Sequence, residues 1–187
     1  WEIKTLYSSG IIDGVTTNPS LMKKAIEELH VKGKKVLLED YIKEILVVAK
    51  GTPVSLEVTA SDYSGMVEQG KTLFKKFNPV AKNVFIKIPV NPSFRSDDSI
   101  WMDGLKAINE LSDLKIPINC TLIFTPEQAL MAAKAGARFV SPFEGREEDF
   151  IRKKGRIRFK KQDYFPFEGI KRKGKMLNDK GIISGYD

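Results

Sequence analysis

Apolar residues along the chain follow two alternating patterns. Runs typical of strands are short and rich in apolar and β-branched residues. They cover residues 14–18, 52–59, 83–88, 117–124 and 138–142. Stretches typical of helices lie before and between these runs, at residues 1–9, 19–29, 38–49, 62–77, 98–113 and 126–136. Because strands separated by helices of this length form parallel βαβ units, the pattern predicts an α/β fold with about five strand–helix units.

The alternation stops after Phe143. Residues 147–180 are basic, contain scattered glycines and show only weak periodicity. Residues 147–187 carry 12 Lys and Arg against 7 Asp and Glu, which accounts for +5 of the formal net charge of +7. We interpret residues 147–183 as a basic insertion within a single domain that spans residues 1–187, and a solvated charged surface is its favoured role. Contact with an anionic partner or another subunit stays open, whereas nucleic acid is not expected.

Length and composition limit the class of protein. The 187 residues suffice for one domain with a sizeable core, but a complete eight-stranded (β/α) barrel has about 250. Hydrophobic residues make up 42% and charged residues 29%, which excludes wholesale disorder. No apolar run approaches the roughly 18 residues of a membrane span and no signal peptide opens the chain, so a cytoplasmic location is expected. Because the chain opens with Trp inside a predicted helix, we expect a segment upstream.

The chain contains one cysteine, Cys120, and one histidine, His30. A single residue of each type excludes disulfide frameworks, zinc clusters, Cys/His dyads and Ser/His/Asp triads. His30 follows an apolar-periodic segment and is interpreted as a surface residue at a helix end. Cys120 lies in an apolar run and is interpreted as a small buried residue. The chemistry is therefore predicted to use other groups, with no metal.

Polar residues occur where each predicted strand ends. In parallel barrels the carboxyl ends of the strands meet on one face, where reactive groups gather. The residues in question are Thr17 and Asn18, then Glu57, then Lys87, then Asn119 and Thr121, and finally Ser141 followed by Arg146. Since all five runs end in this way, the sequence predicts one convergent polar site.

Lys87 stands out among these residues because its strand is otherwise apolar, from Val84 to Pro89. A lysine in a strand is usually an exposed edge residue, which is the plain alternative. An apolar environment disfavours the charged ammonium form, so a buried Lys87 would be a nucleophile for carbonyl groups. With metal ligands missing, we expect an imine to serve as the electron sink.

The neighbouring polar residues complement an amine nucleophile. Glu57 would either form a structural ion pair with Lys87 or move protons through a water during imine formation, and both roles are compatible. Asn119 and Thr121 are two residues apart on one strand, so they share a face on which they could hold that water and a substrate hydroxyl. Arg146 offers a planar fork suited to phosphate, with a surface salt bridge as the alternative.

Four segments carry a family resemblance. Residues 13–21 (DGVTTNPSL), 87–89 (KIP), 119–124 (NCTLIF) and 141–146 (SPFEGR) resemble transaldolases, in the same order and at similar spacing. The resemblance covers about residues 1–146. It implies a (β/α)₈ TIM barrel, incomplete in this chain, and a transferase of carbohydrate metabolism in the pentose phosphate pathway. That enzyme would move a dihydroxyacetone unit between a ketose phosphate and an aldose phosphate without a cofactor.

The resemblance also implies a role for each site residue. Lys87 would form the Schiff base, while Glu57 and Thr121 would bind and activate a water. Asn18 and Asn119 would orient the adduct, and Ser141 with Arg146 would bind the hydroxyl and phosphate groups of the substrate. The implied catalytic residues are Lys87, Glu57 and Thr121, and the implied substrate-binding residues are Thr17, Asn18, Asn119, Ser141, Phe143 and Arg146.

The chain departs from the family pattern in three respects. The aspartate that the family carries on its first strand is not seen, and Asp13 would lie at the opposite end of the barrel. The last two strands are not seen either, and residues 147–183 replace a short connection. We expect a homo-oligomer, although the C-terminal elements that set the oligomeric state in such proteins are also not seen.

Two other functions stay open at this point. Fructose-6-phosphate aldolase, a close relative that releases dihydroxyacetone, has the same lysine but a tyrosine at the position of Phe143 and a glutamine near that of Glu57. Both residues here favour transaldolase. The remaining alternative is a non-catalytic barrel that binds an anionic partner such as RNA, against which Lys87 and Glu57 argue.

Overall fold

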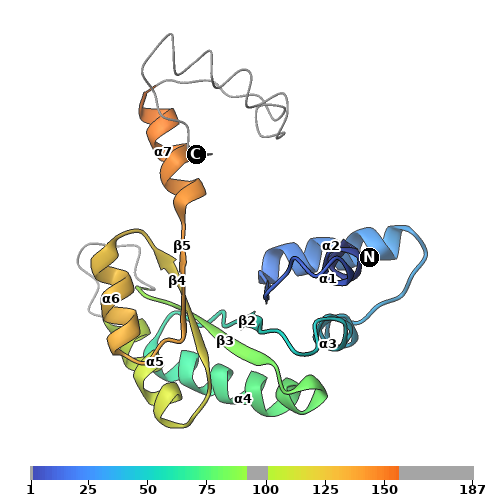
Figure 1. Ribbon diagram of the computed structural model, residues 1–187, viewed down its shortest axis with the longest axis horizontal. Coiled ribbons are helices and arrows are strands. Elements are labelled where there is room, and N and C mark those ends of the chain that lie inside the picture. The colour runs from blue at the N-terminus through green and yellow to red at the C-terminus, as the bar shows by residue number, and fades with distance from the viewer. Residues whose placement is uncertain (1, 92–100, 156–187) are drawn as a thin grey trace. The chain divides into compact units, whose positions relative to one another are not determined.

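A curled sheet of five parallel strands forms the core of Trp1–Pro142, the first of two compact units in the computed structural model (Figure 1). The structure describes residues 2–91 and 101–155. The strands are β1 (Val15–Thr16), β2 (Val54–Glu57), β3 (Val84–Pro89), β4 (Ile118–Ile123) and β5 (Phe139–Pro142). They neighbour one another in chain order, and every pair is parallel. This is the strand order of a partial (β/α) barrel, so the predicted fold class is confirmed.

Helices precede and separate the strands, as the periodicity predicts. They are α1 (Glu2–Ser8), α2 (Pro19–Val31), α3 (Leu38–Val48), α4 (Tyr63–Ala81), α5 (Asp103–Asp113) and α6 (Pro126–Lys134). Helix α4 extends past the predicted end at residue 77 and contains Pro79 in its last turn. It ends at Lys82, whose left-handed conformation turns the chain into β3. Helix α5 begins at Asp103, and residues 98–100 of the predicted helix lie outside the described residues.

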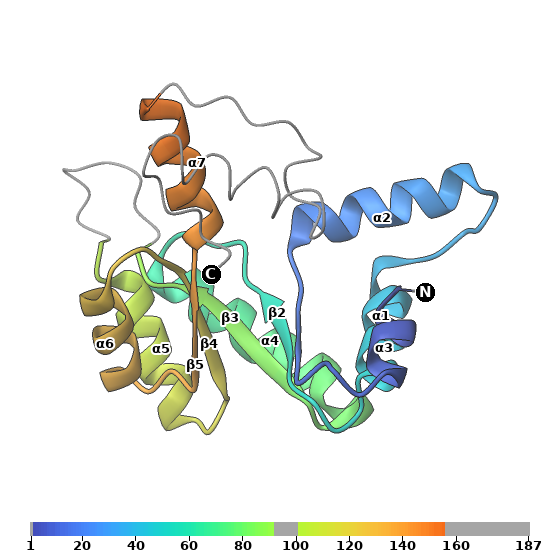
Figure 2. The same ribbon diagram turned by 45° about the horizontal axis from the view of Figure 1, so that its top comes forward.

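The face of the sheet that packs against the helices is apolar. Val84, Ile86 and Ile88 of β3 are all 0–1% exposed, and their neighbours on β2 and β4 are equally apolar. Figure 2 shows α4, α5 and α6 on the same side of the sheet. Helix α5 approaches the end of β3 so closely that a Cβ atom at Gly104 would lie 2.0 Å from the carbonyl oxygen of Pro89. Since side chains alternate along a strand, the opposite face carries the polar residues.

Strand β4 contains a β-bulge. Cys120 pairs with Val140 of β5, but the next pair joins Ile123 to Pro142, so β4 has one more residue than β5 in this interval. Leu122, within the bulge, has a φ of 58°. L side chains rarely adopt this left-handed region. The alternation of faces that Asn119 and Thr121 follow therefore ends at Thr121.

The second unit begins at Phe143, and its described part is helix α7 (Glu144–Lys154). The sequence did not predict this helix, because its apolar residues Phe150 and Ile151 are adjacent rather than spaced by three or four. Acidic residues in the first turn and basic residues in the last turn suit the helix dipole, and Glu148 pairs with Arg152 one turn later. The predicted insertion at residues 147–183 thus starts in a helix, and its residues 156–183 lie outside the described part.

The one histidine and the one cysteine of the sequence have the exposure and the burial that the sequence predicts. His30 is exposed in the last turn of α2, and its Nε2 atom lies 3.0 Å from the Val36 carbonyl oxygen. Cys120 is fully buried among apolar residues, and burial raises the pKa of its thiol to about 12. No helix within residues 2–91 and 101–155 is both long and apolar enough to cross a membrane.

Candidate active site

Three polar side chains occupy one level of the polar face. Glu57 of β2 is in register with Lys87 of β3, and Lys87 is in register with Asn119 of β4. In parallel strands, paired residues point to the same side of the sheet. Lys87 is only 6% exposed and lies on the central strand, so the interpretation as an exposed edge residue is wrong. Sheet pairing thus brings together three of the residues that the sequence predicted.

The amine of Lys87 faces two oxygen acceptors. Its Nζ atom lies 3.4 Å from Oε2 of Glu57 and 3.5 Å from the backbone oxygen of Thr17. Both distances are long for hydrogen bonds, so the amine is held loosely. Phe85 lies two residues before Lys87 on the same face, and its ring centroid is 5.1 Å from that of Phe139, which is in register with Asn119. The amine therefore has a carboxylate beside it, and aromatic rings lie on the same face of the sheet.

A chain of hydrogen bonds fixes the amide of Asn119. Oγ of Ser141 donates to Oδ1 of Asn119 at 2.9 Å, and Nδ2 of Asn119 donates to Oγ of Ser55 at 3.0 Å. The sequence predicted Asn119 and Ser141 but missed Ser55. Ser55 lies two residues before Glu57 and shares its face, and that spacing was the available signal.

Thr121 is fully buried, and its Oγ1 atom has no hydrogen-bond partner among the described residues. Its backbone is in register with Pro89, and its carbonyl oxygen accepts a hydrogen bond from Val90 N at 2.9 Å. A buried hydroxyl without a protein partner is unfavourable unless a water or ligand pairs with it. The hydroxyl of Thr121 can therefore hold a water or a substrate oxygen at this site.

Thr17 and Asn18, which follow β1, are both tied into the fold. Oγ1 of Thr17 donates to the Ser55 carbonyl oxygen at 2.8 Å. Oδ1 of Asn18 accepts from the backbone nitrogens of Ser20 and Leu21 and so caps α2. The amide NH₂ of Asn18 is the part that can still donate to a substrate.

Phe143 and Arg146 belong to the second unit. Phe143 is the N-cap residue of α7, and Arg146 is exposed in the first turn of that helix. Their predicted contacts with substrate stay predictions.

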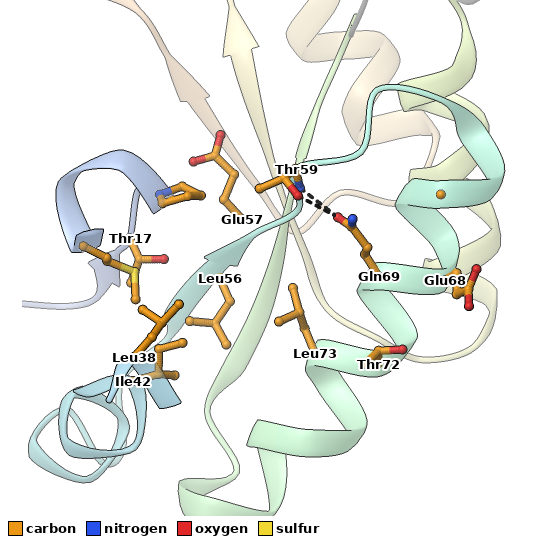
Figure 3. A pocket seen from close by; sticks show the side chains of 13 residues that line it. Thr17, Leu38, Ile42, Leu56, Glu57, Thr59, Glu68, Gln69, Thr72 and Leu73 are labelled. Atoms are coloured by element: carbon orange, nitrogen blue, oxygen red, sulfur yellow. Dashed lines mark hydrogen bonds between the residues drawn. The ribbon is translucent and has the colours of Figure 1, made fainter. Parts of the chain in front are cut away.

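A separate cavity of about 560 Å³ lies on the helix side of β2 (Figure 3). Leu38, Ile42, Leu56 and Leu73 give it an apolar lining, and Thr59 is hydrogen-bonded to Gln69 at its rim. Lys87 does not line this cavity. The cavity therefore shares Glu57 with the row of Glu57, Lys87 and Asn119, but neither Lys87 nor Asn119 lines it.

Metal ligation has no support within the part of the chain that the structure describes. No three His, Cys, Asp or Glu side chains there come close enough together to hold a metal ion. The buried face around Lys87 offers a primary amine, the carboxylate of Glu57, the carboxamide of Asn119 and the hydroxyl groups of Ser55, Thr121 and Ser141. These groups can form and hydrolyse a covalent adduct with a carbonyl compound and hold its hydroxyl groups.

Comparison with known proteins identifies a family for this chain. A family model described as "Transaldolase/Fructose-6-phosphate aldolase" matches residues 1–177. A "Probable transaldolase" of Nitrosopumilus maritimus is 46% identical over 148 residues, which cover 79% of this chain and 56% of that protein. Proteins with the same description from Thermoplasma acidophilum and Methanococcus vannielii are 47% and 45% identical over 148 residues. The matches cover 79% of this chain and 57% and 58% of those proteins. The chain thus matches a little more than half the length of these relatives.

Proposed function

Because the chain belongs to the transaldolase and fructose-6-phosphate aldolase family, we propose that it provides the Schiff-base lysine of a transaldolase. The enzyme would transfer a dihydroxyacetone unit from a ketose phosphate to an aldose phosphate. One observation carries the proposal, namely that the amine of Lys87 is buried with Oε2 of Glu57 at 3.4 Å. The setting that this implies is carbohydrate metabolism of the pentose phosphate type in the cytoplasm, with the enzyme acting as a homo-oligomer.

The first step joins the amine to the substrate. The Nζ atom of Lys87 attacks the ketone carbon, and the carbonyl oxygen leaves as water after it has taken up protons. Glu57 would accept a proton from the attacking amine and return one to the departing hydroxyl, since its Oε2 atom lies 3.4 Å from Nζ. The buried hydroxyl of Thr121 would hold the water that carries these protons.

The second step breaks the carbon–carbon bond. The iminium takes up the electron pair of the bond between C3 and C4, which leaves an enamine on Lys87 and releases the aldose phosphate as an aldehyde. Asn119 is fixed between Ser141 and Ser55 and would orient the hydroxyl groups of the three-carbon unit. The resemblance assigns the base for the C4 hydroxyl proton to an aspartate on the family's first strand.

The fate of the enamine separates transaldolase from fructose-6-phosphate aldolase. In a transferase the enamine attacks an acceptor aldehyde, whereas in an aldolase it is protonated and dihydroxyacetone is released. Glu57 and Phe143 support transfer. Product analysis of the full-length natural protein with fructose 6-phosphate, with and without erythrose 4-phosphate, distinguishes the two. We expect products only when the acceptor is present, and free dihydroxyacetone in its absence would favour the aldolase.

Borohydride trapping tests the central assignment. We expect reduction in the presence of fructose 6-phosphate to attach the three-carbon or six-carbon unit to Lys87, as located by peptide mass mapping of the full-length protein. Lys87→Arg should abolish the label because a guanidinium stays protonated. The control is Lys82→Arg, at an exposed lysine that ends α4. A label on any lysine other than Lys87 would overturn the proposal.

A further inference from the structure

The β-bulge in β4 lies inside the candidate site. Between the pairs Cys120 with Val140 and Ile123 with Pro142, β5 has one residue, Ser141, and β4 has two. Thr121 and Leu122 therefore both lie opposite Ser141. Two of these three residues are polar groups of the site, so the bulge sets how Thr121 and Ser141 face each other.

The bulge also changes which way the strand faces. In a regular strand Asn119, Thr121 and residue 123 would all point to the polar face. The extra residue reverses the alternation, and Ile123 instead joins the apolar core with an exposure of 2%. Thr121 keeps the side that a regular strand gives it, and the next odd-numbered residue packs with the core. The alternation reverses at Leu122, whose backbone is left-handed with a φ of 58°.

We propose that Leu122 is a positioning residue whose left-handed backbone holds the Thr121 hydroxyl in place for imine formation at Lys87. Three observations define the position of Thr121. The Thr121 carbonyl oxygen is bound by Val90 N at 2.9 Å, its backbone is in register with Pro89, and its Oγ1 atom is buried without a partner among the described residues. The inference rests on the proposed function, because the Thr121 hydroxyl acts only on an adduct at Lys87.

Two substitutions at position 122 separate backbone from side chain. Glycine adopts positive φ readily, so Leu122→Gly keeps the bulge and removes the side chain. Isoleucine has the composition of leucine but is β-branched, so Leu122→Ile opposes the left-handed conformation. The control is Lys115→Ile, at an exposed residue with a φ of 63° in the turn before β4. This control introduces the same backbone strain at a position remote from the site.

The experiment measures the rate of borohydride trapping at Lys87 in the full-length natural protein, together with thermal unfolding. We expect Leu122→Ile to slow trapping by roughly tenfold or more, part of the about 10²–10⁴-fold that a positioned acid–base group contributes. Leu122→Gly and Lys115→Ile should trap at nearly the wild-type rate, even where they lower the melting temperature. In a Thr121→Val background, Leu122→Ile should have no further effect, because the group that it positions is gone.

Three outcomes would overturn the inference. If wild-type protein is labelled at Lys87 and Leu122→Ile is labelled equally fast, the backbone of Leu122 does not position Thr121, and the proposed function stands. If Leu122→Gly is as slow as Leu122→Ile, the side chain matters rather than the conformation. If wild-type protein is not labelled at all, the proposed function fails and the role of Leu122 fails with it.

Discussion

Adjacent residues on the two faces of β3 are both buried but differ in their chemistry. Ile86 faces the helices and is 0% exposed, while Lys87, the next residue, faces the other way and is 6% exposed. Burial of an apolar side chain is a main source of stability, whereas burial of a charged one costs free energy unless partners satisfy it. The helix side of β3 thus stabilises the fold, and the opposite side carries polar groups that stability alone does not require.

The polar face also satisfies its groups less completely than a structural network would. The Lys87 amine lies 3.4 Å and 3.5 Å from its nearest acceptors, and the Thr121 hydroxyl has none among the described residues. By contrast, Nδ2 of Asn83, buried beside the helices, lies 2.9–3.3 Å from three backbone oxygens, although Oδ1 of Asn83 also has no partner among the described residues. Groups left available in this way are suited to bind a substrate, so the comparison supports separate roles for the two faces.

The largest expected effect comes from removing the charges of Lys87 and Glu57 on the polar face. Lys87→Met combined with Glu57→Gln should abolish imine trapping, since the nucleophile is lost. The same variant should unfold at the same denaturant concentration as wild type or a higher one, because replacing a buried ion pair by neutral residues of similar size is often neutral or stabilising. Denaturant unfolding and borohydride trapping on the full-length protein measure both.

Lys87→Met alone is the matched control for that variant. It leaves the carboxylate of Glu57, whose side chain is 19% exposed, without its cation. It should therefore be less stable than the double variant. If the double variant is the less stable of the two, the ion pair stabilises the fold and the contrast between the faces is weaker than we infer.

Shortening a side chain on the helix face should have the opposite effect. Ile86→Ala removes a fully buried side chain that packs toward Gly70 of α4 and should lower the free energy of unfolding by about 2–5 kcal/mol. Folded Ile86→Ala protein should still trap the adduct at nearly the wild-type rate, because its side chain does not face Lys87. Trapping measured below the unfolding transition checks this, and a large loss of rate there would link the two faces.

Ser55→Ala should produce a smaller effect on both properties. Removing Oγ of Ser55 leaves Nδ2 of the buried Asn119 without its acceptor, which costs about 1–3 kcal/mol. Because the Asn119 amide is then less firmly oriented, kcat should fall while the KM for the ketose phosphate changes little. The control is Ser112→Ala, which removes a serine hydrogen bond to the Gly136 carbonyl oxygen near the amino ends of the strands. A stability loss without a change in kcat would assign Ser55 to structure alone.

The smallest effect concerns Cys120, a helix-face residue that can titrate. Its pKa is raised to about 12 by burial, whereas the thiol of an unfolded chain titrates at about 8.5. Between these values only the unfolded state loses the proton, so the free energy of unfolding should fall as the pH rises from about 9 toward 12. Cys120→Ala should lessen that dependence, and native protein at pH 8 should resist alkylation at Cys120. Rapid alkylation of Cys120 in protein that stays folded would show that the reagent reaches the helix-facing side of the sheet.

Much of the candidate site could be predicted because parallel strands align their carboxyl ends. The positions of three apolar runs were enough to predict Lys87, Glu57 and Asn119. A single lysine in an apolar run can be identified whichever way the strands pair. Ser55 was missed because a small hydroxyl residue in a strand carries no signal until its partner Asn119 is known. The cap formed by Asn18 likewise depends on where α2 begins.

The sequence by itself determined the order of strands and helices, the apolar helix face and the polar ends of the strands. These features follow from the periods of two and 3.6 residues, which are local properties. Only the tertiary structure decided that Lys87 is buried, that Asn119 lies between Ser55 and Ser141, and that β4 contains a bulge at Leu122. A left-handed leucine has no local signature, because a conformation unfavourable for the residue alone is stabilised by the strands paired on either side and by the burial of Ile123.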